Sequence, residues 1–311
     1  MKTLLNSIGN TPLVKIFSQF PTNIFAKLEY LNPGGSIKDR SAKYMVEWAE
    51  QQGLLKPGMT LIDASSGNHG IALAMIGSIK GYKVIICSMD KHSKEKINTM
   101  KAYGATVYTF PGTTALEDPN SYHSQAVKLA QQTPNSHMPN QYCNPLNATA
   151  HYHDIGPEIW KQTNGKITHL IAAAGTGGTV SGAGKFLKEM NPNIQIIGVD
   201  AKNSYRSTKG NPKPYKLEGM GVDSESIVLD NSVIDHFIEV DDEQGINMMK
   251  TLAHQHGFLV GPSSGAVAHA AHSYAKNLKP PDLCVSIFGD SGRAYLSKNY
   301  FITQVKSSSS L

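Results

Sequence analysis

Lys38 is the residue in this sequence best placed to act as a nucleophilic amine. It lies in LNPGGSIKDR, directly after a Pro-Gly-Gly turn, where a helix is expected to begin. A lysine at a helix N-terminus, partly removed from water, can have its pKa lowered enough to form an imine. The alternative is a solvated Lys-Asp-Arg charge cluster that only starts the helix.

Two loops of small residues could hold anionic groups near such an amine. The first, SSGNHG at 65–70, follows a short apolar strand and precedes an apolar helix. Strand, small-residue loop and helix start form the geometry in which backbone N–H groups point at an anion. His69 is unusual in this loop, because an imidazole is bulky and titratable where a hydroxyl would suffice.

The second loop, GTGGT at 175–179, directly follows another apolar strand. A dinucleotide-binding fingerprint would need glycine or alanine at 180, where the chain has Val180. A P-loop would need glycine at 179 and Ser or Thr at 186, where Thr179 and Phe186 stand. The remaining interpretations are a cradle for one small phosphate or a glycine turn needed only for packing.

The elements around these loops alternate between strands and helices. Helices are predicted over 41–52, 70–80, 93–102, 122–132, 154–162, 179–190, 242–256 and 265–277. Strands are predicted over 83–89, 105–110, 167–175, 194–200, 258–261 and 283–289. Such alternation favours α/β domains, each with a mainly parallel central sheet covered by helices.

The repeated pattern predicts two α/β domains, over 1–145 and 146–304, with the start of the chain able to cross to the second domain. Residues 305–311 read as a disordered tail.

Composition is typical of a soluble globular protein. The chain has 311 residues, of which 40% are hydrophobic and 17% charged, with a net charge of +5. No apolar run approaches the roughly 20 residues that cross a bilayer, and no signal peptide is recognisable. Three distant cysteines predict no disulfide framework or zinc site and favour the cytoplasm. The basic stretch 91–101 reads as a solvated helix face, which gives nucleic-acid binding little support. His151 and His153 are predicted to be structural or at the surface rather than a metal pair.

Together the motifs resemble the β-family of pyridoxal-phosphate enzymes, which includes cysteine synthase and the catalytic core of cystathionine β-synthase. Five separated motifs occur in the family's order, from IGNTPLVKI at 8–16 to DSGRAYLSK at 290–298. The resemblance therefore covers nearly the whole chain. It implies fold type II, in which a small N-terminal domain closes against a larger one over pyridoxal 5′-phosphate. It also implies a homodimer acting on small amino-acid and thiol substrates.

The resemblance assigns roles to individual residues. Lys38 matches the lysine that forms the Schiff base, Asn68 the residue hydrogen-bonded to the cofactor's ring oxygen, and Ser263 the residue facing the pyridine nitrogen. The implied phosphate-binding residues are Gly175, Thr176, Gly177, Gly178 and Thr179. The implied substrate-binding residues are Ser65, Ser66, Gly67, His69, Gln141, Glu218, Gly219 and Gly221.

The implied reaction is β-replacement on serine or O-acetylserine with a thiol acceptor, through an aminoacrylate intermediate. Some motifs, such as GPEIW at 156–160, resemble cysteine synthases. Others, such as KLEGMGVD at 216–223, look more like the cystathionine β-synthase core, which is the favoured alternative, with homocysteine as acceptor. SSGNHG also looks like the loop of serine racemase and the dehydratases, which remain a more distant alternative.

Two positions carry open alternatives. Glu218 stands where the cystathionine β-synthase core has a glutamate near the acceptor pocket; otherwise it is an exposed loop carboxylate. His69 replaces a family threonine that helps to hold the substrate carboxylate. Either its imidazole takes over that contact, which would make donor binding pH-dependent between roughly pH 6 and 8, or it turns away and the backbone binds alone.

Overall fold

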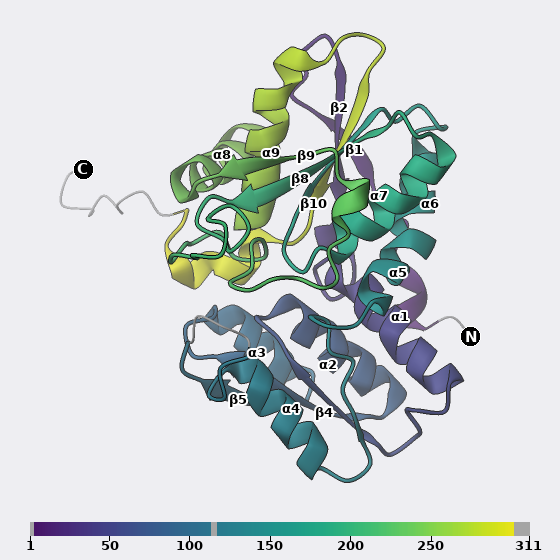
Figure 1. Ribbon diagram of the computed structural model, residues 1–311, viewed down its shortest axis with the longest axis vertical. Helices are drawn as coiled ribbons and strands as arrows, with labels where there is room; N and C mark the ends of the chain where they lie inside the picture. The colour runs from purple at the N-terminus through teal and green to yellow at the C-terminus, as the bar shows by residue number, and fades with distance from the viewer. Residues whose placement is uncertain (1–2, 113–116, 302–311) are drawn as a thin grey trace, which may run out of the picture.

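The computed structural model, in which residues 3–112 and 117–301 are described, is built around two sheets (Figure 1). The larger sheet has the strand order β1 (Leu13–Ile16), β2 (Asn23–Leu28), β10 (Leu283–Phe288), β7 (His169–Ala173), β8 (Gln195–Ala201), β9 (His236–Val240). The smaller sheet has the order β5 (Thr106–Phe110), β4 (Lys83–Met89), β3 (Thr60–Ala64), β6 (Ser136–His137). Neighbouring strands are parallel except β1 and β2. The α/β class predicted from the sequence is confirmed.

The beginning of the chain joins the larger sheet. β2 pairs in parallel with β10, placing Ile24 opposite Cys284, and β1 covers the outer edge of β2. In Figure 1 these purple strands lie among the green and yellow elements of the C-terminal half. The smaller sheet therefore draws its strands from residues 60–137. The predicted tail at 305–311 lies outside the described residues.

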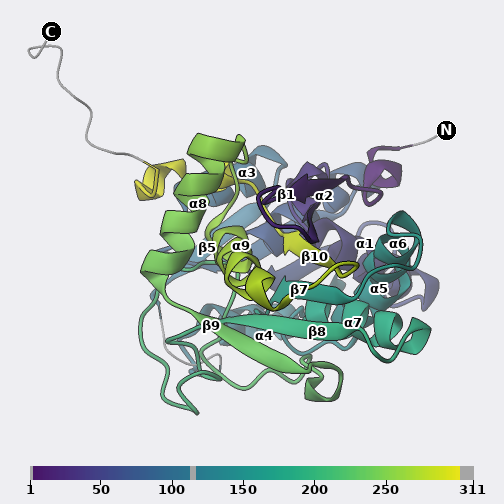
Figure 2. The same ribbon diagram turned by 90° about the horizontal axis from the view of Figure 1, so that it is seen from above.

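Helices pack against each of the two sheets, and those around the larger sheet are seen from above in Figure 2. The strands of the smaller sheet contact α2 (Asn68–Lys80), α3 (Lys94–Ala102) and α4 (Tyr122–Gln132), and α1 (Lys38–Gln51) packs on α2. The strands of the larger sheet contact α7 (Gly178–Met190) and α9 (Pro262–Tyr274). Helices α5 (Leu146–His153) and α6 (Ile155–Gln162) pack on α7, and α8 (Asp242–His256) packs on α9. Short 3₁₀ turns are η1 (Leu4–Ser7), η2 (Glu29–Leu31), η3 (Asn231–Val233), η4 (Ala275–Asn277) and η5 (Gly292–Lys298).

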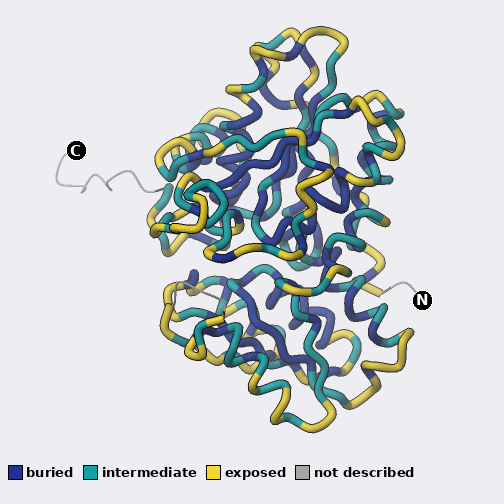
Figure 3. The backbone as a smooth tube through the Cα atoms, in the orientation of Figure 1, coloured by how far each residue is buried: buried dark blue, intermediate teal, exposed yellow. Residues whose placement is uncertain are grey.

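Local sequence accounts for these elements. The central strands are continuous apolar runs because both of their faces are buried, as the dark-blue interiors of the two units show (Figure 3). Helix α2 ends at Gly81, which adopts the left-handed conformation that glycine tolerates best. Helix α8 begins with a capping box between Asp241 and Gln244 and ends at Gly257, also left-handed.

One predicted strand is wrong. The stretch 258–261 forms only an isolated bridge, between Val260 and Ser291, because it lies against the turn after β10 rather than against a strand. Strands β1, β2, β6 and β9 and helix α5 were not predicted: α5 follows Pro145 directly and has only a weak amphipathic pattern. These differences do not alter the loops at the carboxyl ends of β3, β7 and β10.

Candidate active site

Lys38 begins α1 at a cavity between the two sheets. The chain before it is held against the end of β10, because the N–H of Ile37 donates to the carbonyl of Gly289 at 2.9 Å. Lys38 is half-buried and lines the cavity, and the loss of water around its amine lowers its pKa to about 8. A substantial neutral fraction near physiological pH is what a nucleophilic or basic amine requires.

Loops at the carboxyl ends of strands from both sheets line this cavity. The smaller-sheet side contributes Ser66, Asn68, His69 and Gln141. The larger-sheet side contributes Gly175, Thr176, Gly177, Gly178, Thr179, Gly219 and Ser263. The carboxyl ends of parallel strands are where α/β folds bind ligands. Four of the residues selected from the sequence are not part of this lining: Ser65, Gly67, Glu218 and Gly221.

The 175–179 loop leads from β7 into α7 and requires glycine. Gly177 has a φ of +88°, and a Cβ there would lie 2.5 Å from the Cβ of Leu229. A Cβ on Gly178 would lie 2.3 Å from Oδ1 of Asn147. The first-turn N–H groups of a helix have no intrahelical partners, and the helix dipole adds positive potential. The loop is therefore suited to one phosphate group.

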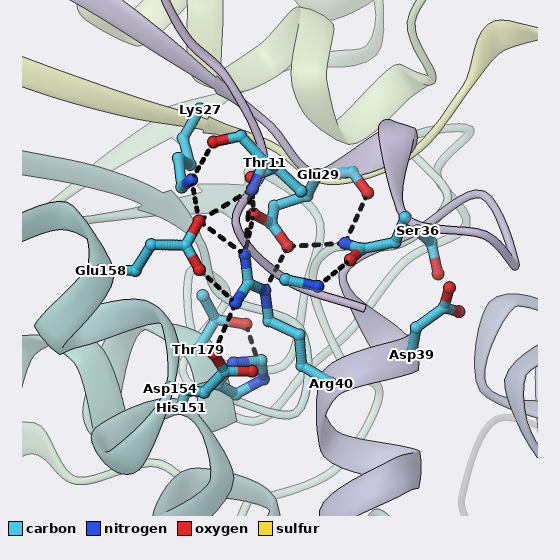
Figure 4. A network of polar contacts seen from close by, with 12 residues as sticks. Thr11, Lys27, Glu29, Ser36, Asp39, Arg40, His151, Asp154, Glu158 and Thr179 are labelled. Atoms are coloured by element: carbon cyan, nitrogen blue, oxygen red, sulfur yellow. Dashed lines mark hydrogen bonds and ion pairs between the residues drawn. The ribbon is translucent and has the colours of Figure 1, made fainter. Parts of the chain in front are cut away.

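Two side chains of α5, one turn apart, support the threonines of this loop. Nδ2 of Asn147 donates to Oγ1 of Thr176 at 3.0 Å. Nε2 of His151 lies 3.3 Å from Oγ1 of Thr179, a contact that Figure 4 shows. Burial lowers the pKa of His151 well below its usual range, and nearby cationic side chains lower it further. The imidazole is therefore neutral. No local pattern in the sequence AHYHD indicated this contact.

A buried charge network anchors the first turn of α1, two residues after Lys38 (Figure 4). Arg40 donates to both carboxylate oxygens of Glu29, at 2.7 and 2.8 Å, to Asp154 at 2.7 Å and to Glu158 at 2.8 Å. Lys27 also pairs with Glu158. Breaking one partner out of such a buried network typically costs about 3–5 kcal/mol. The network ties α1 to α6 and to the larger sheet. It therefore fixes the position of Lys38, the first residue of α1.

The SSGNHG loop divides its residues between structure and cavity. Ser65 is fully buried, and its Oγ accepts from the N–H groups of Gly67, at 3.0 Å, and Gly70, at 2.8 Å. Its hydroxyl therefore caps the start of α2. Ser66 lines the cavity together with Gln141, whose Nε2 donates to the backbone of β3 at 3.3 Å.

The side chain of His69 is directed at a partner that the sequence did not single out. Its Nε2 lies 3.0 Å from Oδ2 of Asp63, the penultimate residue of β3, while Oδ1 of Asp63 accepts from the N–H of Ala64 at 2.7 Å. Both side chains are buried, and Nδ1 of His69 has no hydrogen-bond partner among the described residues. Because an ionised carboxylate only accepts, Nε2 carries the hydrogen.

On the opposite wall, Ser263 and Gly219 lie close together. Ser263 is the second residue of α9 and is 6% exposed. Gly219 has a φ of +87°, and a Cβ there would approach Oγ of Ser263 to 3.3 Å. Gly221, at φ +68°, leaves room for the hydroxyl of Tyr215. Because Gly219 and Gly221 have no side chains, they leave space beside Ser263 and Tyr215.

Glu218 is held between two lysines. Its Oε2 lies 3.4 Å from Nζ of Lys96, and its Oε1 lies 3.2 Å from Nζ of Lys298. Lys96 lines the cavity and is 2% exposed, so the prediction of a solvated helix face for 91–101 is wrong at this residue. Asp290 also lines the cavity, and sequence reasoning missed both residues. Lys96 pairs with Glu218 and Asp290 with Asn68, and both partners lie too far along the chain for a local motif to indicate them.

No group of three or more His, Cys, Asp or Glu side chains within residues 3–112 and 117–301 is arranged to hold a metal ion. In the same part of the chain, no helix is both long and apolar enough to cross a membrane.

Comparison with known proteins gives curated relatives of two kinds. Over 308 residues the chain is 45% identical to a cystathionine beta-synthase of Apis mellifera, covering 96% of this chain and 61% of that protein. Over 296 residues it is 42% identical to a probable cysteine synthase of Bacillus subtilis, covering 93% of this chain and 94% of that protein. The chain thus spans about three-fifths of the length of the cystathionine beta-synthases that it matches.

Solved structures agree with the fold. An O-acetylserine-dependent cystathionine beta-synthase from Helicobacter pylori superimposes with a TM-score of 0.91 at 36% identity, covering 97% of this chain and 99% of that one. A hydrogen sulfide-producing enzyme from Fusobacterium nucleatum gives a TM-score of 0.90 at 38% identity, covering 95% and 99%. The family model described as "Pyridoxal-phosphate dependent enzyme" matches residues 4–290. With nine-tenths of its length matched to that model, this chain belongs to the pyridoxal-phosphate-dependent enzymes.

Proposed function

We propose that this chain catalyses β-replacement: an amino-acid donor, serine or O-acetylserine, loses its β-substituent and takes up a thiol. The observation that carries the proposal is the placement of the Lys38 amine, with its pKa lowered to about 8, in the same cavity as the phosphate-type loop 175–179. An amine and a phosphate cradle in one cavity are the two attachments that pyridoxal phosphate needs.

The residues of the cavity fit this cofactor. The 175–179 loop offers backbone N–H groups at the start of α7 and the hydroxyls of Thr176 and Thr179, which suits a phosphate dianion. We assign Asn68 to the cofactor's ring oxygen and Ser263 to its ring nitrogen. When bound, pyridoxal phosphate supplies the electron sink for bond cleavage at the substrate's α-carbon.

Lys38 moves the proton in this proposal. With cofactor and donor bound, the Lys38 amine would be placed to take the proton from the substrate's α-carbon. A pKa of about 8 leaves it able to accept that proton near neutral pH. The hydroxyl of Ser263, unlike a carboxylate, does not hold a proton on the ring nitrogen. An unprotonated ring nitrogen favours rapid loss of the β-substituent over racemisation.

The α-carboxylate of the donor is assigned to the SSGNHG side of the cavity. Ser66 and Gln141 line it, and the backbone amides at the start of α2 point out of the helix N-terminus. Ser65 and Gly67 act behind this surface, because the Ser65 hydroxyl holds the Gly67 and Gly70 amides in place.

For the acceptor we favour homocysteine, an amino acid that carries both charges. Glu218, beside the cavity residue Gly219, already lies between the ammonium groups of Lys96 and Lys298. An acceptor's ammonium group can take the place of a lysine against this carboxylate. Sulfide has no group that uses it.

Cysteine synthase activity is the second candidate, because the Bacillus subtilis relative of that kind matches nearly end to end. The deciding experiment is a steady-state comparison of serine and O-acetylserine, each with homocysteine and with sulfide. We expect the highest kcat/KM with homocysteine; a clear preference for sulfide would replace this proposal by cysteine synthase. Pyruvate from serine alone as the main product would instead support a dehydratase.

We further propose that the protein acts as a cytoplasmic homodimer with two α/β domains. Cys87, Cys143 and Cys284 are free thiols, as a reducing compartment requires. Sedimentation of the purified protein tests the dimer: a single species at the monomer mass would exclude it.

A further inference from the structure

A chain of hydrogen bonds runs from the cofactor-facing residue Asn68 to the ammonium of Lys96. Nδ2 of Asn68 donates to Oδ2 of Asp290 at 2.7 Å, and the hydroxyl of Tyr295 donates to the same oxygen at 2.5 Å. Nζ of Lys96 donates to the Tyr295 hydroxyl at 2.8 Å and lies 4.1 Å from the centre of its ring. These hydrogen bonds join α2 and α3 to the segment after β10, and so connect the two sheet-containing units.

Three of these groups are closed off from solvent, and Asn68 is half-buried. Tyr295 is fully buried, and Asp290 and Lys96 are each 2% exposed. Two glycines leave room for them: a Cβ on Gly261 would lie 2.0 Å from Oδ1 of Asp290, and a Cβ on Gly67 would lie 2.2 Å from Cδ of Lys96. A buried carboxylate is retained only where it is paired and hydrogen-bonded. Here both hydrogen bonds go to Oδ2, and Oδ1 has no partner among the described residues. Burial raises the pKa of this carboxyl, and the ammonium of Lys96, acting through one phenol, opposes that rise.

The directions of the bonds are fixed by the chemistry of the groups. An ammonium only donates and a carboxylate only accepts, so the Tyr295 hydroxyl must accept from Lys96 and donate to Asp290. Only Nδ2 of the Asn68 amide can face Asp290, because Oδ1 of Asn68 is an acceptor and cannot hydrogen-bond to a carboxylate oxygen. One Nδ2 hydrogen is used by Asp290, and the second remains for a ligand in the cavity.

We propose that Asp290, supported by Tyr295 and Lys96, is a positioning residue that sets the orientation of the Asn68 amide so that Asn68 donates to the ring oxygen of the cofactor. The inference rests on the proposed function, since it assumes that Asn68 faces that oxygen. Burial raises the pKa of Tyr295 well above its usual range, and the Asp290 carboxylate adds to this effect. The phenol therefore remains a donor to Asp290 throughout the working pH range.

The experiment measures the bound cofactor rather than turnover. Wild type, Asp290→Ala, Asp290→Asn and Tyr295→Phe are titrated with pyridoxal phosphate, and the absorption maximum and dissociation constant of the bound cofactor are recorded. Tyr82→Phe is the matched control, because the Tyr82 hydroxyl also donates to a carboxylate, that of Glu50 at 2.7 Å, and has no contact with Asn68, Asp290, Tyr295 or Lys96.

We expect Asp290→Ala to shift the absorption maximum and to weaken cofactor binding about tenfold, the size of one charge-assisted hydrogen bond. Tyr295→Phe should shift the absorption maximum and weaken cofactor binding in the same direction, but less than Asp290→Ala does. Asp290→Asn should retain most of the wild-type spectrum, because its amide oxygen can still accept from Asn68. Tyr82→Phe should match wild type.

Combination with Asn68→Ala separates positioning from a general structural role. If Asp290 acts through Asn68, Asp290→Ala and Tyr295→Phe should change cofactor affinity less than twofold in the Asn68→Ala background. Undiminished losses in that background, or a wild-type spectrum and affinity in both single variants, would overturn the proposal. Should Asp290→Ala fail to fold, Tyr295→Phe, which removes one oxygen atom, decides alone. Failure of the wild type itself to bind pyridoxal phosphate would instead contradict the proposed function.

Discussion

The imidazole of His69 is hydrogen-bonded through Nε2 to the buried carboxylate of Asp63, at 3.0 Å. In the sequence His69 looked like a replacement for a hydroxyl that holds the substrate's carboxylate. In the structure its donor nitrogen is committed to Asp63, at the end of β3. The histidine therefore ties the loop to the smaller sheet. In the proposed function, the substrate is then bound by the loop amides that do not donate to Ser65.

His69→Thr should destabilise the fold. A threonine side chain is too short to reach Oδ2 of Asp63, and a buried acceptor without its donor costs about 1–3 kcal/mol. Urea unfolding at neutral pH measures the loss. The double variant Asp63→Ala, His69→Thr should be less destabilised than the sum of the two single variants, because it buries no unpaired carboxylate. Additive losses would contradict a direct bond between the two residues.

The same variant tests substrate contact. With Nε2 committed to Asp63, we expect wild type and His69→Thr to give superimposable pH profiles for the KM of the donor between about pH 6 and 8. A profile that flattens in the variant would show that the imidazole contacts the carboxylate, as one interpretation of the sequence held.

Ser263→Asp should slow loss of the β-substituent. A carboxylate against the ring nitrogen would hold a proton there and change the electronics of the cofactor. We expect the single-turnover rate with O-acetylserine to fall at least about tenfold, equivalent to about 1.4 kcal/mol. Ser263→Ala is the control, since it introduces no charge and should stay within a few-fold of wild type. An unchanged rate in Ser263→Asp would place the serine away from the nitrogen.

Glu218→Gln should separate the two acceptors. Loss of a charged partner from a binding site costs on the order of 2 kcal/mol, or about thirtyfold in kcat/KM with homocysteine. Sulfide, which has no ammonium group, should lose much less. Lys298→Met is the control: it removes the ion pair between Lys298 and Glu218 but keeps the Glu218 carboxylate, and so shows how much that ion pair alone affects turnover. Equal losses with both acceptors in Glu218→Gln would remove Glu218 from the acceptor site.

The Arg40 network predicts an acid limit to stability. Burial acts to raise the pKa of Glu158, but hydrogen bonds and charges from Arg40 and Lys27 prevail and lower it to about 2, from a usual 4.5. A lowered carboxyl pKa stabilises the fold above pH 4.5, and this contribution, about 3 kcal/mol, is lost as the pH falls towards 2. In urea unfolding, the stability difference between wild type and Glu158→Gln should shrink over that range. Glu189→Gln, at an exposed site, should show no such trend.

The sequence was sufficient where function depends on local order. A small-residue loop between an apolar strand and a helix is a local pattern, and it located the 65–70 and 175–179 loops and the Lys38 turn at one cavity. The same reasoning explains why the alternating elements yielded the correct fold class, with parallel sheets whose loops meet on one side.

The sequence did not predict which side chains the buried polar residues of the site contact. Asp63 reads as the end of a strand, Lys96 as one charge on a basic helix, and Asp290 as a turn residue. Each is buried because of a partner brought in by the fold, 6 residues away for Asp63 and 199 or more for the bonds of Lys96 to Tyr295 and of Asp290 to Asn68. Position in the chain carries no signal for such pairs.

The identity of the reacting lysine is the central claim, and trapping it tests the claim most directly. The protein loaded with pyridoxal phosphate is reduced with borohydride, digested, and the modified peptide identified. We expect the label on Lys38, and its loss in Lys38→Ala, although that variant should still bind the cofactor through the 175–179 loop. Label on Lys96, the other lysine of the cavity, or on any further lysine would contradict the account.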